Sequence, residues 1–435
     1  MIISEIHKKP QRPERVIQFG GGGFLRGFAD WMLQELNDKG LWNGSAVIVQ
    51  STQSSTADLM MSQNCLYTHI MRGAEGTESK IIDVISRCIK AQEDFGSFLA
   101  LAKNHDMRFI ISNTTEAGIV FDPEDTSDEQ PPKSFPAKLT LLLKHRFDLG
   151  LDGFIILPCE LIERNGDTLK NIVVKYARLW GLGEKFEDWV VNRNIFCNTL
   201  VDRINTGYPN DEPIDLGYED KLINTSEFYH LWVIETEHDI ESELPFGKAG
   251  LNVIVTHDGL EKYRTRKVRI LNGAHTSLVP YALLSGFDTV KSCIDDPGMS
   301  SFMRRCIYDE IIPTLDLPKE ALTAYADSVL VRFSNPYIKH YLSSIALNSV
   351  SKFRVRVLPS ILEYYRRFGR PPANLIFAFS KLIEFYRTDM PNDSPDITQF
   401  MQTHTTAEIL ANKDLWGEDL SFMNGDLINA DSPVR

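Results

Sequence analysis

The chain has 435 residues, of which 46 are Lys or Arg and 59 are Asp or Glu, so its formal net charge is −13. This charge excludes nucleic acid as an expected partner, because a phosphate backbone would be repelled, but it allows a small anionic substrate in a local basic pocket. A hydrophobic content of 43% and a charged content of 24% are ordinary for a globular protein. The length is sufficient for two domains.

The N-terminal residues and the cysteines predict a cytoplasmic protein. Residues 1–10 lack the apolar core of a signal peptide, and no apolar run approaches the ~18 residues that span a membrane, so no membrane association is expected. The six cysteines are scattered without a C-x-x-C pair, which is typical of free, mostly buried thiols in a reducing compartment. The histidines are also dispersed and form no metal-ligand pattern, so no metal is expected.

Strand and helix patterns alternate through the first half of the chain. An apolar strand at 15–20 runs into four glycines and is followed by a helical pattern over 24–36. Further strands are predicted at 45–50, 80–85, 108–113 and 153–157, with helices near 92–104 and 137–147 and an exposed loop at 121–136. This alternation predicts an α/β fold with a mainly parallel, doubly wound, Rossmann-like sheet.

The strand signals fade at about residue 250. Long amphipathic stretches then dominate, at 266–285, 300–313, 319–331, 336–349 and 373–387. We therefore expect two domains, a dinucleotide-binding Rossmann-like domain over 1–250 and a mainly helical substrate and catalytic domain over 251–435.

The glycine run after the first strand is a candidate dinucleotide site. Gly20 can form the tight turn, Gly22 can let the backbone approach a pyrophosphate, and a helix N-terminus follows from Gly23. The G-x-G-x-x-G pattern fails at Leu25, so a glycine-rich turn without a ligand remains an alternative. The second strand ends at 49–52 with neither an acidic residue nor an arginine, which leaves NAD and NADP undistinguished.

The segment 267–275 holds the candidate catalytic groups Lys267, Asn272 and His275. At about 100° per residue of helix, Asn272 lies roughly 140° and His275 roughly 80° from Lys267, so all three can face one cleft. A partly desolvated lysine can exchange a proton near neutral pH, as the interconversion of a carbonyl and an alcohol requires, and an adjacent amide can hold the substrate oxygen. The alternative is three residues that merely share a helix, although Asn272-Gly273 is a poor helix-forming pair.

Two further polar segments are candidates for ligand binding. Residues 113–118, Asn-Thr-Thr-Glu-Ala-Gly, follow an apolar strand, where a doubly wound sheet places ligand contacts; a loop that caps a helix is the alternative. A late basic cluster can hold a substrate carboxylate, with arginine giving bidentate contact, or can be a solvated helix face. Its members are Arg332, Lys339, His340, Arg354 and Arg356.

Four motifs resemble those of the mannitol dehydrogenase family, the long-chain polyol dehydrogenases, and the resemblance covers nearly the whole chain. The matches are Gly20, Gly22, Phe24 and Arg26 for G-x-G-x-F-x-R; Lys267, Asn272 and His275 for the catalytic helix; 201–204 for Val-Asp-Arg-Ile; and 332–336 for Arg-Phe-x-Asn-Pro. One segment departs from the polyol members, because Leu161 stands where they carry an asparagine, although Asn165-Gly166 is kept.

The resemblance implies NAD(H) as the cofactor, and no metal is required because the lysine takes the place of a Lewis acid. The cofactor-binding residues it implies are Gly20, Gly22, Gly23, Phe24, Arg26, Thr115 and Glu116. The resemblance implies that Lys267 acts as the acid and base. It also implies that Asn272, with Asn165, donates amide hydrogen bonds to the substrate oxygen. The alternative for Asn165-Gly166 is a plain turn. His275 would bind a substrate hydroxyl or tune Lys267. Asp202 would be a site carboxylate, unless it forms a surface pair with Arg203.

The resemblance is closest to the branch of the family that acts on sugar acids. It implies reversible, NADH-dependent reduction of D-tagaturonate to D-altronate in hexuronate catabolism, with a small sugar acid as the only expected partner. Reduction of fructuronate to mannonate, a neutral-polyol activity and a non-catalytic nucleotide-binding regulator remain alternatives. The residues do not indicate an oligomeric state.

Overall fold

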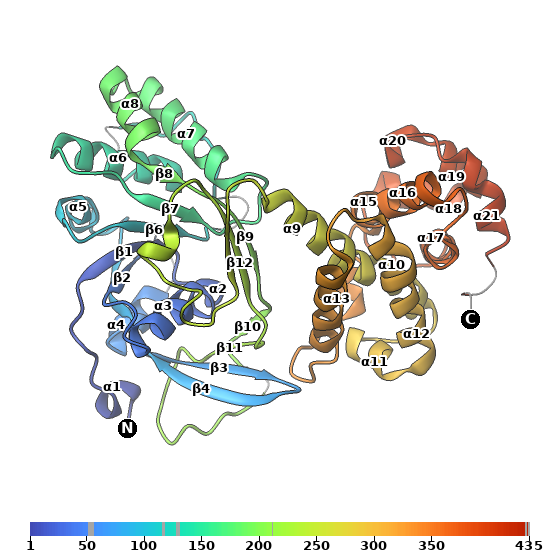
Figure 1. Ribbon diagram of the computed structural model, residues 1–435, viewed down its shortest axis with the longest axis horizontal. Coiled ribbons are helices and arrows are strands. Elements are labelled where there is room, and N and C mark those ends of the chain that lie inside the picture. Colours follow the sequence, from blue (N-terminus) through green and yellow to red (C-terminus); the bar gives the residue numbers. More distant parts are fainter. Residues whose placement is uncertain (51–55, 115–117, 128–130, 211, 431–432, 434–435) are drawn as a thin grey trace. The chain divides into compact units, whose positions relative to one another are not determined.

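A computed structural model describes residues 1–50, 56–114, 118–127, 131–210, 212–430 and 433 of the chain. The chain forms two compact units, Met1–Leu260 and Glu261–Arg435. The first unit is built on sheets and the second on helices (Figure 1), which confirms the predicted fold class. None of the described helices is long and apolar enough to cross a membrane.

The central sheet of the first unit has six parallel strands in the order β5-β2-β1-β6-β7-β8. The strand order therefore reverses between β1 and β6, which is where a doubly wound sheet opens a crevice for a ligand. The strands are β1 (Glu14–Phe19), β2 (Ser45–Gln50), β5 (Ile85–Lys90), β6 (Phe109–Ser112), β7 (Ile155–Pro158) and β8 (Ile195–Phe196).

Both faces of this sheet are buried. Val16 belongs to one apolar cluster and its neighbour Ile17 to another, because successive side chains of a strand point to opposite faces. The first cluster includes α3 (Ala29–Asp38) and α4 (Thr56–Ser62). The second includes α5 (Phe95–Ala100), α6 (Phe135–Asp148), α7 (Asn165–Leu179) and α8 (Glu184–Arg193). Covering helices on both faces explain why the parallel strands are almost wholly apolar.

Two smaller mixed sheets complete the first unit. One has the order β10-β11-β3-β4 and the other β13-β12-β9. Their strands are β3 (Tyr67–Gly73), β4 (Gly76–Ile82), β9 (Asn198–Asp202), β10 (Asn205–Gly207), β11 (Asn224–Ser226), β12 (Leu231–Glu235) and β13 (Val253–Thr256). The predicted strand at 80–85 was wrong as a single element, because it spans the end of β4 and the start of β5. The predicted helix at 24–36 is likewise divided, into α2 (Gly23–Arg26) and α3.

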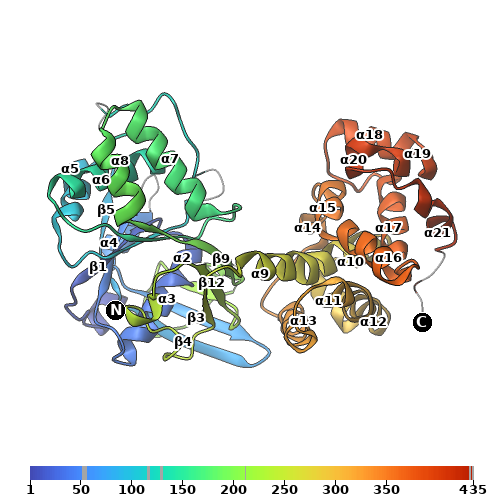
Figure 2. The ribbon, with the colours of Figure 1, turned by 45° about the horizontal axis from the view of Figure 1, so that its top comes forward.

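The second unit is helical, as predicted. Its helix α10 (Gly273–Leu284) runs among α12 (Pro297–Arg305), α15 (Ser349–Arg356) and α17 (Ala373–Tyr386) (Figures 1 and 2). Aromatic rings join these helices, since Tyr281 meets Phe377 edge-on at 5.0 Å. Helix α9 (Leu260–Arg266) leads toward α10. The unit also contains α11 (Val290–Asp295), α13 (Lys319–Phe333), α16 (Leu358–Phe368) and the short C-terminal helices from α18 (Pro395–Thr403) to α21 (Asn424–Ile428).

The predicted helix at 336–349 was wrong. Residues 335–341 are irregular, and only α14 (Leu342–Ile345) is helical before α15 begins at Ser349. Pro336 explains the interruption, because a proline disfavours the helical conformation of the residue before it. The apolar spacing of this segment comes from Ile338 and Leu342, which are buried from a loop and a single turn.

Candidate active site

The glycine turn after β1 closes tightly onto the end of β6. Gly20 has a φ of +110°, and a Cβ added there would lie 2.9 Å from the carbonyl oxygen of Asn113. Both observations require glycine at this position. Among the described residues, no protein atom lies within 4 Å of a Cβ added at Gly22. The turn is therefore closed against the protein at Gly20 and has free space at Gly22, and both features fit a pyrophosphate approaching the backbone.

Arg26 supports this turn from inside the unit. Its guanidinium is buried and donates hydrogen bonds to the carbonyl oxygens of Gly21, at 3.2 Å, and Leu222, at 2.6 Å. Phe24, the other side chain of the motif, stacks on Phe28 with ring centroids 5.0 Å apart. In the described structure, the motif's arginine thus holds the backbone of the turn, and its phenylalanine packs against the following helix.

Gly27 is a residue that sequence reasoning missed. A Cβ added there would lie 2.7 Å from side-chain atoms of Asn205 and Asn224, and 2.9 Å from the ring of His69. The helix can therefore approach β10, β11 and β3 only because position 27 has no side chain. In the G-x-G-x-x-G pattern the third glycine permits close helix–strand packing. Here Leu25 occupies that place, and the glycine two residues later was the available signal.

The loops that follow β6 and β7 are tied together by the buried carboxylate of Glu160. It accepts hydrogen bonds from Ser112 Oγ at 3.0 Å, and from the backbone N–H and Oγ of Thr114 at 2.9 Å each. Burial raises the pKa of this carboxyl group. Asn113 adds a hydrogen bond from Nδ2 to the carbonyl oxygen of Cys159, at 2.9 Å. The predicted cofactor residues Thr115 and Glu116 lie outside the described residues.

Asn165 is buried and its amide is fully engaged within the first unit. Its Nδ2 donates to the carbonyl oxygens of Pro158 at 2.9 Å, Glu160 at 3.1 Å and Thr199 at 3.2 Å, and its Oδ1 accepts from the Thr199 N–H at 2.8 Å. The amide thereby fastens the loop after β7 to β9. Leu161, the departure from the polyol pattern, is 59% exposed beside it.

Asp202 and Arg203 are both buried, which excludes the surface pair considered from the sequence. Arg203 donates to the carbonyl oxygens of Gly27 at 2.7 Å and Glu227 at 2.8 Å, and its guanidinium lies 4.3 Å from the ring centroid of Trp31. Burial lowers the pKa of Arg203 to about 9. Asp202 is the last residue of β9, opposite Leu231 of β12. The Val-Asp-Arg-Ile motif is therefore part of the interior of the first unit.

Lys267 and Asn272 begin and end a π-helical turn between α9 and α10. Such turns are rare and are frequent at functional sites. The sequence analysis assumed α-helical geometry, in which residues five apart diverge by roughly 140°. A π-turn bonds each residue to the one five positions away and so brings residues at that spacing nearer to one face. Gly273 follows directly, and a Cβ there would lie 3.1 Å from the Arg356 carbonyl oxygen.

His275 lies one turn further along, buried in α10. Its ring stacks on Phe333 at 4.1 Å and meets His340 edge-on at 5.6 Å. Among the described residues its Nε2 has no hydrogen-bond partner. Burial, and then the nearby His340, Arg332 and Arg356, hold the pKa of His275 well below its usual range. The imidazole is therefore neutral at physiological pH, with a buried polar atom left to serve a ligand.

The structure divides the predicted basic cluster. Arg332, His340 and Arg356 gather around His275, and Nη1 of Arg356 donates to Thr276 Oγ on α10 at 3.5 Å. Arg354 instead donates to the carbonyl oxygen of Asp414, in α20 (Lys413–Trp416), at 3.3 Å. Lys339 is exposed on the loop between Arg332 and His340. Burial lowers the pKa values of both Arg356 and His340.

Among the described residues, no group of three or more His, Cys, Asp or Glu side chains could hold a metal ion. The chemistry available in the second unit is thus a half-buried lysine and an amide on one π-turn, followed by a neutral histidine among arginines. This combination can transfer a proton to a substrate oxygen, donate hydrogen bonds to it and bind an anionic group nearby.

Comparisons with known proteins agree with this arrangement. Residues 14–247 match the mannitol dehydrogenase Rossmann domain, and residues 259–429 match the mannitol dehydrogenase C-terminal domain. The chain is 45% identical to an altronate oxidoreductase of Bacillus subtilis (strain 168), over 94% of the chain and 90% of that protein. It is 42% identical to an altronate oxidoreductase of Escherichia coli O6:K15:H31, over 95% of the chain and 92% of that protein.

Two solved structures share the fold at 21% identity. D-sorbitol dehydrogenase in its substrate-free form matches with a TM-score of 0.82, over 96% of this chain and 92% of that one. Pseudomonas fluorescens mannitol 2-dehydrogenase, in a ternary complex with NAD and D-mannitol, matches with a TM-score of 0.72, over 97% of this chain and 90% of that one. With both domain models matched and identities above 40% across most of its length, the chain belongs to the mannitol dehydrogenase family.

Proposed function

We propose that the chain is an altronate oxidoreductase, also called tagaturonate reductase, which converts D-tagaturonate, NADH and a proton into D-altronate and NAD⁺, reversibly. Full-length relatives of that name at 42–45% identity support the proposal. The observation that carries it is the buried Nε2 of His275, which has no hydrogen-bond partner among the described residues. His275 lies near Arg332 and Arg356, on α10, directly after the π-turn that Lys267 begins. A sugar that carries a carboxylate needs both hydrogen-bond partners for its hydroxyls and cations for its acid group.

The first unit has the features that a dinucleotide requires. Gly20 makes the turn, Gly22 leaves space for the pyrophosphate, and Arg26 braces the backbone between them. The bound nicotinamide cofactor supplies the hydride. Gln50, at the end of β2, does not by itself distinguish NAD from NADP. We assign NAD(H) because the family includes a dehydrogenase described as a complex with NAD.

Lys267 acts as the acid in reduction and as the base in oxidation. It gives its proton to the substrate oxygen as hydride reaches the ketone carbon, and it removes that proton in the reverse direction. Its half-buried position suits this role, because partial desolvation favours release of the proton. Asn272, brought toward the same face by the π-turn, donates a hydrogen bond to the developing alkoxide, which is commonly worth about 3–4 kcal/mol.

The remaining predicted residues divide between substrate and scaffold. Arg332 and Arg356 bind the carboxylate, and neutral His275 binds a hydroxyl. Arg354, which contacts α20, takes no part. Asn165 acts by positioning the loop after β7, because its amide hydrogens are already engaged. Asp202 remains a proposed site carboxylate. The six cysteines are all buried free thiols, which supports a reducing, cytoplasmic location.

A lysine variant tests this mechanism. Lys267→Ala should lower turnover of tagaturonate by roughly 10²- to 10⁴-fold, the usual contribution of general acid–base catalysis, while NADH still binds with nearly unchanged affinity. NADH fluorescence titration and steady-state NADH oxidation give the two readouts. Lys319→Ala, at the exposed start of α13, is the matched control and should leave both unchanged. Near-normal turnover of Lys267→Ala would show that another group moves the proton.

A further inference from the structure

A pocket of about 560 Å³ lies within the second unit, apart from the proposed substrate residues. Its walls are α9 with the start of the π-turn, the turn at 314–317, and α16. Lys267, Asn272 and His275 are not among its lining residues, although the pocket is built on the same helix. The volume falls within the roughly 300–1,000 Å³ that is usual for small-molecule sites.

The pocket is cationic in a chain that is acidic overall. The charged side chains that line it are Lys262, Arg266, Arg269, Arg366, Arg367, Glu261, Asp316 and Glu363. Five cations against three carboxylates leave an excess of two positive charges. That excess matches the roughly two negative charges of a phosphate monoester at neutral pH.

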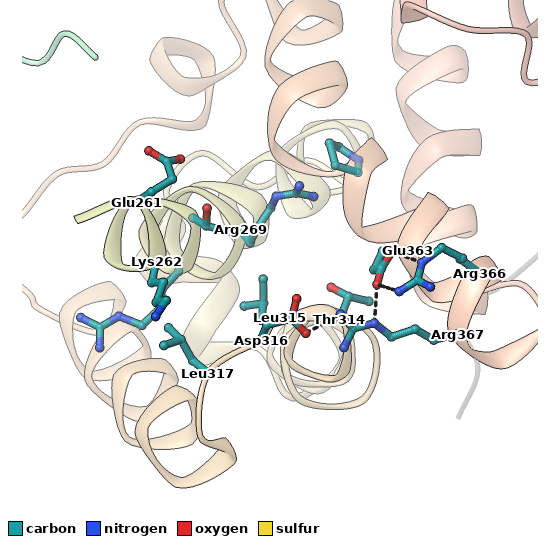
Figure 3. Close-up of a pocket in the computed structure, with 13 residues that line it drawn as sticks. Glu261, Lys262, Arg269, Thr314, Leu315, Asp316, Leu317, Glu363, Arg366 and Arg367 are labelled. Atoms are coloured by element: carbon teal, nitrogen blue, oxygen red, sulfur yellow. Dashed lines mark hydrogen bonds and ion pairs between the residues drawn. The ribbon is translucent and has the colours of Figure 1, made fainter. Parts of the chain in front are cut away.

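The three carboxylates that line the pocket already form ion pairs with arginines. Glu363 pairs with Arg366 at 2.5 Å and with Arg367, and Asp316 pairs with Arg367 at 2.7 Å (Figure 3). Glu261 pairs with Arg264 at 3.3 Å. Figure 3 shows Lys262 and Arg269 on the wall opposite the Glu363 cluster. In the part of the chain that is described, Lys262, Arg266 and Arg269 make no ion pair, so the excess charge resides on α9 and the π-turn.

The two arginines of this wall are held in place by uncharged groups and form no ion pair among the described residues, although the charge of Glu363 acts on Arg269. The guanidinium of Arg266 lies 4.2 Å from the ring centroid of Tyr325 and 5.0 Å from that of Tyr263, and its Nε is buried without a hydrogen-bond partner among the described residues. Stacking fixes the plane of a guanidinium and leaves its N–H edge for an oxyanion. Nη1 of Arg269 donates to Ser360 Oγ at 3.3 Å. Partly buried cations that form no ion pair are costly, and a bound anion would relieve that cost.

We propose that this pocket binds a phosphate monoester, such as a sugar phosphate, through Arg266 and Arg269, with Lys262 adding charge at the exposed rim. Lys262 and Arg266 lie one turn apart on α9, and Arg269 lies in the first half of the π-turn; all three line this pocket. Thr265 also lines the pocket and offers a hydroxyl to the same ligand, whereas the Thr314 hydroxyl already donates to the carbonyl oxygen of Ile311 at 2.7 Å. The site is separate from the cluster around His275 and does not depend on the proposed function.

Calorimetric titration of the full-length protein tests the site. The probes are glucose 6-phosphate, inorganic phosphate and gluconate, at an ionic strength matched with NaCl and with NADH present to fill the predicted cofactor turn. We expect one site for glucose 6-phosphate, with affinity reduced about tenfold or more in Arg269→Gln and Arg266→Gln. Inorganic phosphate binding as tightly would also support the site and would identify the free ion as its source.

Control variants separate this pocket from other basic regions. Arg370→Gln removes the same charge from an exposed position outside the pocket, and Arg332→Gln removes it from the cluster at His275; neither should change binding. Lys262→Gln, at an exposed position, should weaken binding about threefold and covers the case in which an arginine variant fails to fold.

Four results would overturn the proposal. The first three are no heat beyond the NaCl control, unchanged affinity in the Arg269, Arg266 and Lys262 variants, and equal binding of gluconate, which would contradict a phosphate site. Loss of binding in Arg332→Gln alone would place the anion at the other cluster and would equally refute it. The readout is binding and not turnover, so a chain inactive on tagaturonate would still give an answer.

Discussion

Asp30 carries an ionisation that should make the first unit less stable at alkaline pH. This residue of α3 is fully buried, and its Oδ2 accepts a hydrogen bond from Tyr67 Oη at 3.1 Å. Burial raises the pKa of Asp30 from 3.8 to about 7, although the hydrogen bond from Tyr67 and the charge of Arg26 oppose the shift. The carboxyl group therefore keeps its proton in the folded protein at pH values where the unfolded chain has lost it.

The size and sign of the effect follow from this difference in pKa. A rise of about 3 pKa units corresponds to about 4 kcal/mol, at 1.36 kcal/mol per unit. Below about pH 4 both states are protonated and the group contributes nothing. As the pH rises from about 4 to about 7, only the unfolded state ionises, so the free energy of unfolding falls. Above about pH 7 the free energy of unfolding has fallen by the full amount.

Asp30→Asn removes the charge and keeps an oxygen that accepts the Tyr67 hydrogen bond. We expect the variant to be more stable than the original chain, with a gain that grows by about 2–3 kcal/mol between pH 5 and pH 8. Urea unfolding at the two pH values, read by the fluorescence of neighbouring Trp31, gives the two differences. At each pH the free energy of unfolding of the original chain is subtracted from that of the variant, which cancels the contributions of the other titrating groups.

Asp188→Asn, at an exposed position on α8, is the matched control and should show the same small difference at both pH values. If the gain in Asp30→Asn were equal at pH 5 and pH 8, or smaller at pH 8, the raised pKa of Asp30 would be refuted.

Three further predictions concern the turn and the proposed substrate residues. Gly27→Ala should lower the melting temperature by several degrees, because its Cβ meets Asn205 and Asn224. Gly22→Ala should keep the melting temperature and weaken NADH binding. The opposite pattern in the two variants would contradict the proposed turn. Arg332→Gln should reduce kcat/KM for tagaturonate at least tenfold more than for fructose, in steady-state assays, because only the former has a carboxylate. His275→Phe should fold normally on Phe333 and raise KM about tenfold; an unchanged KM would exclude a hydroxyl contact.

The parts of the fold that could be predicted are those with a dense local pattern. The strand entering Gly20, its parallel neighbours β2, β6 and β7 and the long helices of the second unit carry a clear apolar pattern, whereas β5 mixes polar and apolar residues and β8 has only two residues. Strands β10 and β11 have three residues each and are polar, so they depend on pairing partners far along the chain. The predicted helix at 336–349 shows the converse error, in which a helical spacing arose from loop residues buried separately.

The site was predictable in its residue types more than in its geometry. A motif shows that Arg26 and Asn165 are present, but only the structure shows that both side chains donate to backbone carbonyls inside the first unit. The π-turn from Lys267 to Asn272 was also beyond reach, because one extra residue in a helical turn leaves no local pattern. Which arginines join His275 depends on how α13 and α15 pack against α10, a long-range property.

The central claim is that this family member reduces a keto sugar acid, tagaturonate, through Lys267. NADH oxidation by the purified protein, with D-tagaturonate, D-fructuronate and D-fructose offered separately, tests it most directly. We predict the highest kcat/KM with tagaturonate and little turnover of fructose, which lacks the carboxylate. A preference for fructuronate or fructose would contradict the proposed substrate, and no turnover of any of the three would contradict the proposed activity.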